Sequence, residues 1–296
     1  MFLSAPSARL RLAIAGDLHG EWSEADAQLL EQLAPDAVLF VGDLSDGDLR
    51  LTKAITRLRQ PTAVILGNHD RGRDRSGNIF QQQINLLGDL HCGWRQRRWT
   101  VPRLGVVGCR PGTAGGGFHL SKAVEAVVGP ISVEESADRI VQACASIPRD
   151  WPLVLLAHCG PTGLGSNAQD PCGRDWKQPA CDWGDADLAL ALDRLGHERP
   201  PQLVVFGHMH HRLKGRQGER RTFHRDRRGT VFLNAACVPR RGLDEQGRGL
   251  CHFSWVEFDN DQLSHVSHRW FLDDGSVAYA ETLYERGLHD QGGHRC

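Results

Sequence analysis

Short apolar runs and helically spaced apolar residues alternate over the first seventy positions of the chain. The runs predict three strands, at residues 10–15, 36–41 and 63–66. Leucines at helical spacing predict two helices among them, one between Ser23 and Pro35 and one at residues 49–58. Because strand and helix alternate, this part of the chain favours a largely parallel α/β arrangement.

The pattern continues less regularly to about residue 206. Apolar runs predict further strands at residues 98–101, 104–108, 152–157 and 202–206. Helices are expected at residues 78–87, 132–147 and 185–195, and Ser132 and Glu135 have the spacing of a capping box. The segment 159–184 is rich in Gly, Pro and Asp, and a connection of this length inside a compact domain is more often functional than idle.

After residue 210 the pattern changes to alternating apolar and polar residues with tight turns. Antiparallel strands are expected at residues 221–224, 230–236, 250–258 and 263–271. A last helix is expected at residues 277–285, followed by a loose tail at residues 287–296. No internal repeat or low-complexity linker divides the chain, so we expect a single domain over residues 1–296.

The composition is ordinary for a globular protein, with 40% hydrophobic and 24% charged residues. The net charge of −1 gives no general attraction to nucleic acid or to a membrane surface. No apolar run approaches the roughly 20 residues that span a bilayer, and the N-terminus lacks the apolar core of a signal peptide. Nine scattered cysteines, an odd number, favour reduced thiols, so we expect a cytoplasmic protein.

Five of the predicted strands end in the same way, with an apolar run followed at once by Asp, Asn or His. These junctions are Ala15-Gly16-Asp17-Leu18-His19, Val41-Gly42-Asp43, Leu66-Gly67-Asn68-His69-Asp70, Leu156-Ala157-His158 and Phe206-Gly207-His208-Met209-His210. Taken singly, such an Asp is more often a helix cap and such a His an ordinary surface or core group. Loops at the carboxyl ends of neighbouring strands meet at one edge of a sheet, however. Since carboxylate, imidazole and amide oxygen bind divalent cations, the five junctions together predict one shared metal site, with enough ligands for two ions.

The order and spacing of these motifs resemble those of the calcineurin-like metallophosphoesterase superfamily. The matching positions are Asp17-x-His19, Gly42-Asp43, Gly67-Asn68-His69-Asp70, His158 and Gly207-His208-x-His210, with about 25 residues between the first three motifs. Within the superfamily the chain looks most like the uncharacterised branch found in cyanobacteria and plants. The resemblance implies an α/β fold, a four-layer αββα sandwich of two mixed β-sheets.

The resemblance also implies a centre of two divalent metal ions, with manganese favoured and iron or zinc as alternatives. Asp17, His19 and His210 would hold the first ion, Asn68, His158 and His208 the second, and Asp43 would bridge them. A metal-bridging hydroxide would then attack the phosphorus of a phosphomonoester or phosphodiester. His69 would act at the leaving group as general acid or as a cation, and Asp70 would orient His69.

Departures from the family pattern narrow the expected substrate. The Ser/Thr protein phosphatase branch has an Arg two residues after its second Asp motif and ends the central motif in Glu. Here the first stretch is Asp43-Leu44-Ser45-Asp46-Gly47, and Asp70 stands in place of Glu, so a small phosphoester is favoured over a phosphoprotein. The fourth motif reads His158-Cys159-Gly160-Pro161 instead of His-x-Pro. This departure affects the loop that follows His158 and leaves His158 itself as a ligand candidate. His211 follows the last motif directly, and the family spacing makes it a neighbour of the site and not a ligand.

Two alternative functions stay open, a non-catalytic metal-binding scaffold of the same fold and a nuclease. The complete set of ligand motifs argues against the scaffold, because non-catalytic relatives usually show eroded motifs. The nuclease depends on a run of basic residues, Arg212, Lys214, Arg216, Arg220, Arg221, Arg225, Arg227 and Arg228. We interpret this run as a solvated hairpin, and expect a small phosphoester as partner, with no membrane.

Other residues could contribute to substrate binding. Arg71 and Arg110 each lie near a predicted strand-end loop and are candidate phosphate clamps. In the segment 159–184, Trp176 and Trp183 could stack on a base or sugar, which would make the segment a substrate-selecting lid. The alternative is a loop that merely packs against the protein.

Overall fold

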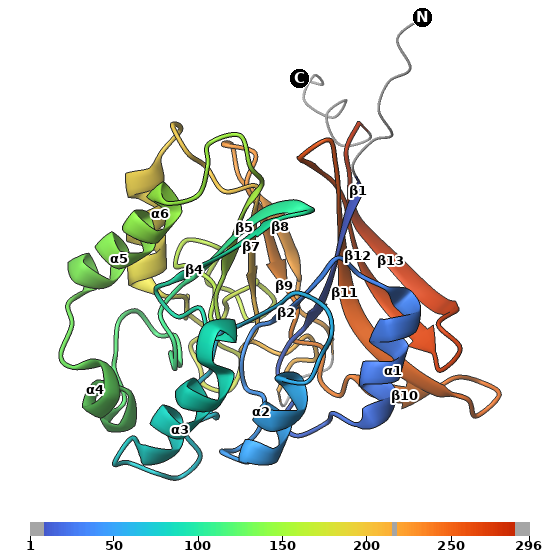
Figure 1. Ribbon diagram of the computed structural model, residues 1–296. Coiled ribbons are helices and arrows are strands. Elements are labelled where there is room, and N and C mark those ends of the chain that lie inside the picture. Colours follow the sequence, from blue (N-terminus) through green and yellow to red (C-terminus); the bar gives the residue numbers. More distant parts are fainter. Residues whose placement is uncertain (1–8, 215–217, 288–296) are drawn as a thin grey trace, which may run out of the picture.

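The computed structural model describes residues 9–214 and 218–287, which form two mixed β-sheets (Figure 1). The first sheet has the strand order β13-β12-β11-β1-β2-β3, and β10 also pairs with β11. Its strands are β1 (Arg9–Ala15), β2 (Ala37–Phe40), β3 (Thr62–Val64), β10 (Arg241–Leu243), β11 (Gly249–Asp259), β12 (Gln262–Leu272) and β13 (Val277–Glu285). The first three strands are parallel, as predicted, and the last four pair antiparallel.

The second sheet has the strand order β4-β5-β6-β7-β9-β8. Its strands are β4 (Gln96–Thr100), β5 (Arg103–Gly108), β6 (Leu153–Leu156), β7 (Leu203–Phe206), β8 (Phe223–Arg225) and β9 (Val231–Asn234). The four central strands β5, β6, β7 and β9 run parallel, whereas β4 and β8 pair antiparallel at the two edges. The short apolar runs of the sequence thus form the centre of each sheet.

Helices cover the outer face of both sheets. They are α1 (Glu24–Leu33), α2 (Leu49–Ile55), α3 (Asn78–Leu87), the 3-10 helix η1 (Gly88–Leu90), α4 (Lys122–Val128), α5 (Val133–Ala145) and α6 (Ala186–Leu195). One apolar cluster joins α1 to α4 with the first sheet, and another joins α5 and α6 with the second. The resulting order of layers, helix, sheet, sheet, helix, confirms the predicted αββα sandwich.

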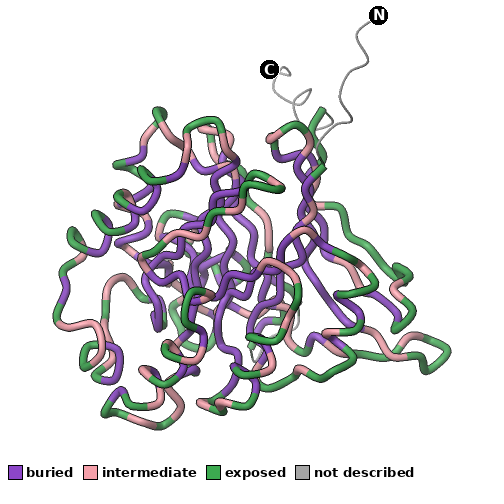
Figure 2. The backbone as a smooth tube through the Cα atoms, in the orientation of Figure 1, coloured by how far each residue is buried: buried purple, intermediate pink, exposed green. Residues whose placement is uncertain are grey.

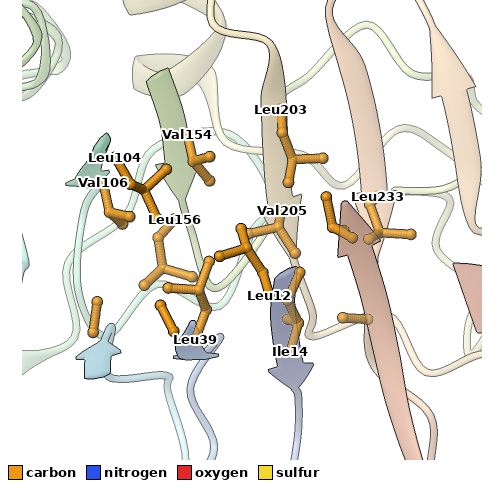
Figure 3. Packing of buried hydrophobic residues seen from close by; sticks show 14 of the residues in the cluster. Leu12, Ile14, Leu39, Leu104, Val106, Val154, Leu156, Leu203, Val205 and Leu233 are labelled. Carbon is orange, nitrogen blue, oxygen red and sulfur yellow. The ribbon is translucent and has the colours of Figure 1, made fainter. Parts of the chain in front are cut away.

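The two sheets face each other across the central apolar core. Leu12, Ile14 and Leu39 of the first sheet point toward Val154 and Val205 of the second, and all are fully buried (Figure 3). Figure 2 shows the central strands of both sheets as the most continuously buried part of the backbone. Burial of aliphatic side chains, worth about 1.5–3 kcal/mol each, therefore holds the sheets at a fixed spacing and sets which strand ends come together.

One predicted element is wrong in type. The expected helix over residues 277–285 is strand β13, which pairs antiparallel with β12. Most of its side chains are exposed, so alternation between a buried and a solvent face is weak, and its Ala, Glu and Leu content favours a helix by propensity. The free edge of β12 decides the outcome, because unpaired backbone groups of an edge strand hydrogen-bond to an extended segment.

Three short elements, η1, α4 and β10, were not predicted, because each is too short to give a clear periodic pattern. In the part of the chain that the structure describes, no helix combines the length and apolar character that crossing a membrane requires. Of the predicted tail, residues 288–296 lie outside the described residues. The single domain stays a prediction, which the core shared by both sheets supports.

A buried charge cluster joins α1 to the chain around β10. The Asp26 carboxylate is fully buried and accepts hydrogen bonds from the guanidinium groups of Arg240 and Arg241 and from the Ser23 backbone N–H. Burial alone would raise the pKa of Asp26, but the charge of and hydrogen bond from Arg240 outweigh burial and hold this pKa below its usual value of 3.8. Asp26 therefore stabilises the fold only while it is ionised.

We predict that Asp26→Asn lowers the free energy of unfolding at pH 7 by about 3–5 kcal/mol, because it leaves buried arginine charge unpaired. A depressed pKa contributes stability above pH 3.8 that is lost as pH falls through the folded-state value. The difference between wild type and variant, measured by urea unfolding, should therefore shrink below pH 3.8.

The matched control is Glu31→Gln in the same helix, whose partner Arg59 lies 3.5 Å away in an exposed pair. This variant should change stability by no more than about 1 kcal/mol at any pH. A loss for Asp26→Asn as small as that of the control would contradict the prediction.

Candidate metal centre

The five predicted junctions come together at one end of the two sheets. β1, β2 and β3 of the first sheet and β6 and β7 of the second each end just before one of the motifs. Two compact groups of possible metal ligands result, in each of which the ligand atoms lie within 4.8 Å of one another. They are Asp17, His19 and His210 in one group and Asp43, His158 and His208 in the other. A third group, His19, Asp46 and His69, meets the same distance limit, but Asp46 and His69 in it are exposed.

In the first group, two imidazoles face each other beside a buried carboxylate. His19 Nε2 lies 3.2 Å from His210 Nε2, and His210 Nε2 lies 3.6 Å from Asp17 Oδ1. Asp17 itself is held from behind, because the His208 backbone N–H donates to both of its oxygens at 3.0 Å. Two imidazole nitrogens and a carboxylate oxygen at this separation are a donor set that fits a divalent cation.

In the second group, His158 is fixed in one tautomer. Its Nδ1 lies 2.7 Å from the Val41 carbonyl and must donate to it, which leaves Nε2 as the nitrogen for a ligand. That Nε2 lies 3.0 Å from Asn68 Oδ1 and 3.4 Å from Asp43 Oδ1. His208 Nε2 is buried and has no hydrogen-bond partner among the described residues. A buried nitrogen without a partner and an oriented imidazole beside two oxygens also fit a metal ion.

The backbone of these loops adopts conformations that ordinary residues rarely take. Asp17, His19, Asp43 and His208 all have φ between 44° and 67°, in the left-handed region. Such conformations cost free energy and cluster at functional sites, where the surrounding structure imposes them. Here the imposing contacts include backbone hydrogen bonds that join the first two loops, such as His19 N–H to the Asp43 carbonyl at 2.9 Å.

Two glycines let these loops approach each other. A Cβ on Gly67 would lie 2.2 Å from Asp43 Oδ1, and one on Gly42 would lie 2.6 Å from the Gly67 nitrogen and 2.7 Å from His158 Nδ1. Gly42 also has φ of 97°. The glycines that precede Asp43 and Asn68 are thus required for the close packing of the candidate ligands.

The electrostatics of the site favour bound cations. Burial alone would raise the pKa of Asp43, but the charge of and hydrogen bond from His158 outweigh burial and hold the pKa well below its usual range. Burial likewise opposes a charged His158, yet Asp43 raises the pKa of His158 to about 10. Burial lowers the pKa of His208 to about 4. Asp43 is thus ionised and His208 neutral, the forms that bind a metal, whereas His158 would have to lose a proton from Nε2 to become a ligand.

The structure does not bring Asp70 to the His69 side chain, so the predicted orienting role of Asp70 does not agree with the geometry. The Asp70 carboxylate is buried and accepts hydrogen bonds from the backbone N–H groups of Gly67, Leu44 and Ser45 at 2.7, 2.8 and 3.2 Å. Burial and the nearby charge of Asp43 raise the pKa of Asp70 to about 8. Asp70 thus joins the second and third motif loops through their backbones.

The partner of His69 is Asp46, which sequence reasoning missed. His69 Nδ1 lies 2.8 Å from Asp46 Oδ1, and both side chains are at least half exposed. Asp46 stands three residues after Asp43, in the stretch where the Ser/Thr protein phosphatase branch has its Arg. The turn around Gly47 brings it back over His69, which no local pattern indicates.

A cleft of about 470 Å³ opens over the second ligand group. Asp43, His69, His208 and His210 line it, together with Trp176 from the segment 159–184. Trp183 packs edge-on against Trp176 with ring centroids 5.3 Å apart, and its Nε1 donates to the Ala114 carbonyl. Of the two tryptophans, only Trp176 therefore borders the cleft.

The two arginines predicted as phosphate clamps lie elsewhere. Arg110 is 1% exposed and its guanidinium pairs with Asp185 at 2.6 Å and Asp187 at 3.1 Å. A buried guanidinium with two carboxylate partners is not available to a substrate, which argues against the predicted role. Arg71 does not line the cleft, and its guanidinium donates to the Gly72 carbonyl. The role of Arg71 stays a prediction.

The basic run after the last motif does not form a continuous patch. Arg220 is buried and donates to three backbone carbonyls of the segment 159–184, those of Ala168, Asp170 and Gly173. Arg221 pairs with Asp170, and Arg228 pairs with Asp193. Arg216 lies outside the described residues. Part of the run thus binds the segment 159–184 to the rest of the protein. A segment held in this way favours the alternative of a packed loop over a substrate-selecting lid.

A family model places these motifs in a known context. The model described as calcineurin-like phosphoesterase matches residues 10–212, more than half of the chain. The chain belongs to the calcineurin-like phosphoesterase family. This family comprises metal-dependent phosphoester hydrolases that bind divalent metals, so the resemblance seen in the motifs is confirmed. No curated protein matches the chain.

Solved structures resemble this calcineurin-like phosphoesterase in fold. TT1561 of Thermus thermophilus superposes with a TM-score of 0.51 at 12% identity, covering 93% of this chain and 99% of that one. Purple acid phosphatase PPD1 from yellow lupin gives 0.48 at 15% identity, covering 93% of this chain and 54% of that one. GAP50 of Plasmodium gives 0.48 at 12% identity, covering 94% and 90%. At this identity the likeness to TT1561 shows a shared fold and nothing about substrate.

The separate roles of the two acids near His69 lead to a prediction. Asp70→Ala should lower the free energy of unfolding by at least about 3 kcal/mol, because three buried backbone N–H groups would lose their acceptor at about 1–3 kcal/mol each. Asp46→Ala, at an exposed position, should stay within about 0.5 kcal/mol of wild type. Chemical denaturation of the two variants measures both values, and equal losses would contradict the assignment.

Proposed function

We propose that this protein hydrolyses a phosphomonoester or phosphodiester with a centre of two divalent metal ions. The observation that carries the proposal is the pair of adjacent ligand groups, each with one buried carboxylate and two imidazoles. Asp17, His19 and His210 would hold one ion, His158, His208 and Asn68 the other, and Asp43 would bridge them. The unpartnered His208 Nε2 and the facing nitrogens of His19 and His210 support this assignment.

Two bound divalent cations, with manganese favoured over iron or zinc, would supply an activated water and neutralise the charge of the phosphoryl group. The chain's own contribution is orientation. The Val41 carbonyl fixes the tautomer of His158, and the backbone N–H groups of His69 and His208 fix the carboxylates of Asp43 and Asp17. These hydrogen bonds set the direction of the ligand atoms before any metal arrives.

His69 is the proposed general acid for the leaving group. It borders the cleft, and its ring lies edge-on to that of His19 with centroids 5.1 Å apart. Asp46 accepts from Nδ1, so His69 in its protonated form would donate the proton on Nε2, which has no hydrogen-bond partner among the described residues. Asp46 takes the supporting role that sequence reasoning gave to Asp70.

A small phosphoester suits the cleft better than nucleic acid does. Arg220, Arg221 and Arg228 of the basic run are paired with protein carboxylates, and paired cations contribute little to binding of a phosphate backbone. The complete ligand set supports an enzyme over a non-catalytic scaffold. These three arginines therefore give no reason to prefer a nuclease.

Protein reloaded with Mn²⁺ should hydrolyse a chromogenic phosphomonoester or phosphodiester and lose this activity with a chelator. Asp43→Ala should lose both ions or nearly so, because one carboxylate would hold the pair together. Elemental analysis of wild type and variant measures the metal content. Fully loaded wild type that is inert toward a broad phosphoester panel would refute the function, and two ions in Asp43→Ala would refute the bridge.

His69→Ala should keep its metals but lower kcat by about 10²–10⁴-fold on esters with poor leaving groups, which need a proton from the enzyme. The loss should be smaller on good leaving groups. His224→Ala, an exposed histidine outside the cleft, is the matched control and should behave as wild type. Equal losses on both kinds of ester would mean that His69 stabilises charge and does not donate a proton.

A further inference from the structure

A second cavity of about 640 Å³ lies next to the metal cleft. Strands β11, β12 and β13 form one wall of it with the faces that they turn toward the second sheet. On β11, His252 lies four residues before Val256 and therefore on the same face of the strand, and Val256 lies in the core between the sheets. The cavity thus continues the space between the sheets, and its volume is within the roughly 300–1,000 Å³ of small-molecule sites.

Three histidines line this cavity, the buried His252 and His268 and the partly buried His211. The rings of His211 and His268 lie 4.7 Å apart, and His252 lies 5.3 Å from His268 and 6.0 Å from His211. His268 has both nitrogens occupied, by Ser254 Oγ and Thr222 Oγ1 at 2.9 Å each. Because His268 has no nitrogen left for an ion, the three rings do not form a further metal site.

The other two histidines have hydrogen-bonding capacity left over. His211 Nε2 must donate to the Asn234 carbonyl at 3.0 Å, so its Nδ1 is an acceptor without a partner among the described residues. His252 is 3% exposed and lines the cavity, and its side chain makes ring contacts but no hydrogen bond among the described residues. These two imidazoles line the cavity and keep nitrogens free to hydrogen-bond, so they can bind the polar edge of a ligand.

Aromatic side chains stand beside these histidines. Trp270 lies opposite His252 on the neighbouring strand, with ring centroids 5.2 Å apart, and Tyr279 of β13 lies opposite Trp270. Both line the cavity, and the Tyr279 side chain is 59% exposed although it is large and aromatic. Flat aromatic walls around uncharged polar groups are suited to a planar ring with hydrogen-bonding edges.

The charge of the cavity is low at its centre. Burial lowers the pKa of His252 well below its usual value, so its imidazole is neutral at pH 7. Arg241 and Arg221, which also line the cavity, pair with Asp26 and Asp170. Arg212, Arg220, Glu219 and Glu281 complete the charged lining, so charges of both signs surround the neutral His252 and the aromatic rings.

The cavity and the metal cleft share part of their lining. Arg212, Arg220 and Val238 border both. His211 follows the candidate ligand His210 directly, and Arg220 Nε donates to the His210 carbonyl at 3.0 Å. One molecule can therefore reach from the ligand groups into the cavity along a common border.

We propose that this cavity binds a planar heteroaromatic ring, such as a nucleobase, of a phosphoester whose phosphate lies in the metal cleft. The inference rests on the proposed function for the position of the phosphate, but ring binding itself does not. His252 and the free nitrogen of His211 would recognise the edge of the ring. Trp270 and Tyr279 would contact its face. The protein is then a phosphoesterase for nucleotide-like substrates.

The test uses phosphate-free probes, so that it does not depend on the metals. Binding of adenosine, guanosine, cytidine and uridine to the full chain is measured by calorimetry and ligand-observed NMR, with ribose as the ring-free comparison. At least one nucleoside should bind and ribose should not. His252→Leu and Trp270→Leu should weaken that binding by about tenfold or more, and Tyr279→Ala by about threefold.

Two controls locate the effect. His265→Leu removes a histidine of β12 outside the cavity and should leave nucleoside binding unchanged. Asp43→Ala, which does not line the cavity, should also bind the nucleoside as wild type does. Tyr279→Ala changes an exposed side chain, so it tests the cavity even where a buried substitution unfolds the protein.

Absence of binding by all four nucleosides, binding equal to that of ribose, or binding unchanged in His252→Leu, Trp270→Leu and Tyr279→Ala would overturn the proposal. If the protein hydrolyses chromogenic esters but binds no nucleoside, the cavity proposal is refuted and the proposed function stands. A protein that binds nucleosides with the expected variant pattern but hydrolyses no phosphoester would support the cavity and refute the proposed function.

Discussion

The apolar contact between the two sheets is the interaction on which the rest of the molecule depends. Leu12 and Ile14 on one side and Val154 and Val205 on the other are fully buried against one another and hold the sheets at a fixed distance. This contact brings the carboxyl ends of strands from two different sheets to one place. Asp17 and Asp43 follow strands of the first sheet, and His158 and His208 follow strands of the second. Without the contact between the sheets, these side chains would lie far apart and neither ligand group would form.

Close packing at that end of the sheets has a cost that the surroundings offset. Four candidate ligands adopt left-handed backbone conformations, and Gly42 and Gly67 approach so closely that neither could carry a side chain. Buried hydrogen bonds from three backbone N–H groups to the Asp70 carboxylate hold the loops in this arrangement. The apolar core positions the loops, and the buried acid fixes their detailed shape.

The same architecture divides the protein into two functional regions. The parallel strands of both sheets deliver the metal ligands, which the motifs of the family identify. The antiparallel strands β11, β12 and β13 have no such motif, yet they continue the inner face of the first sheet with histidine and tryptophan in place of aliphatic residues. Chemistry and recognition would then lie on neighbouring parts of one surface, with the border residues Arg212 and Val238 between them.

Much of this followed from the sequence alone, because it depends on local pattern. Apolar runs identified most strands, and the five junctions identified the candidate ligands, since each ligand follows its strand within a few residues. Contacts between distant segments could not be read in this way. The exchange of Asp70 for Asp46 beside His69, the burial of Arg110 between Asp185 and Asp187, and strand β13 in place of a helix all depend on which surfaces meet after folding. The cavity lined by His211, His252 and His268 combines a loop residue after β7 with residues of β11 and β12. No regular spacing in the sequence relates the three, so only the tertiary structure shows that they meet.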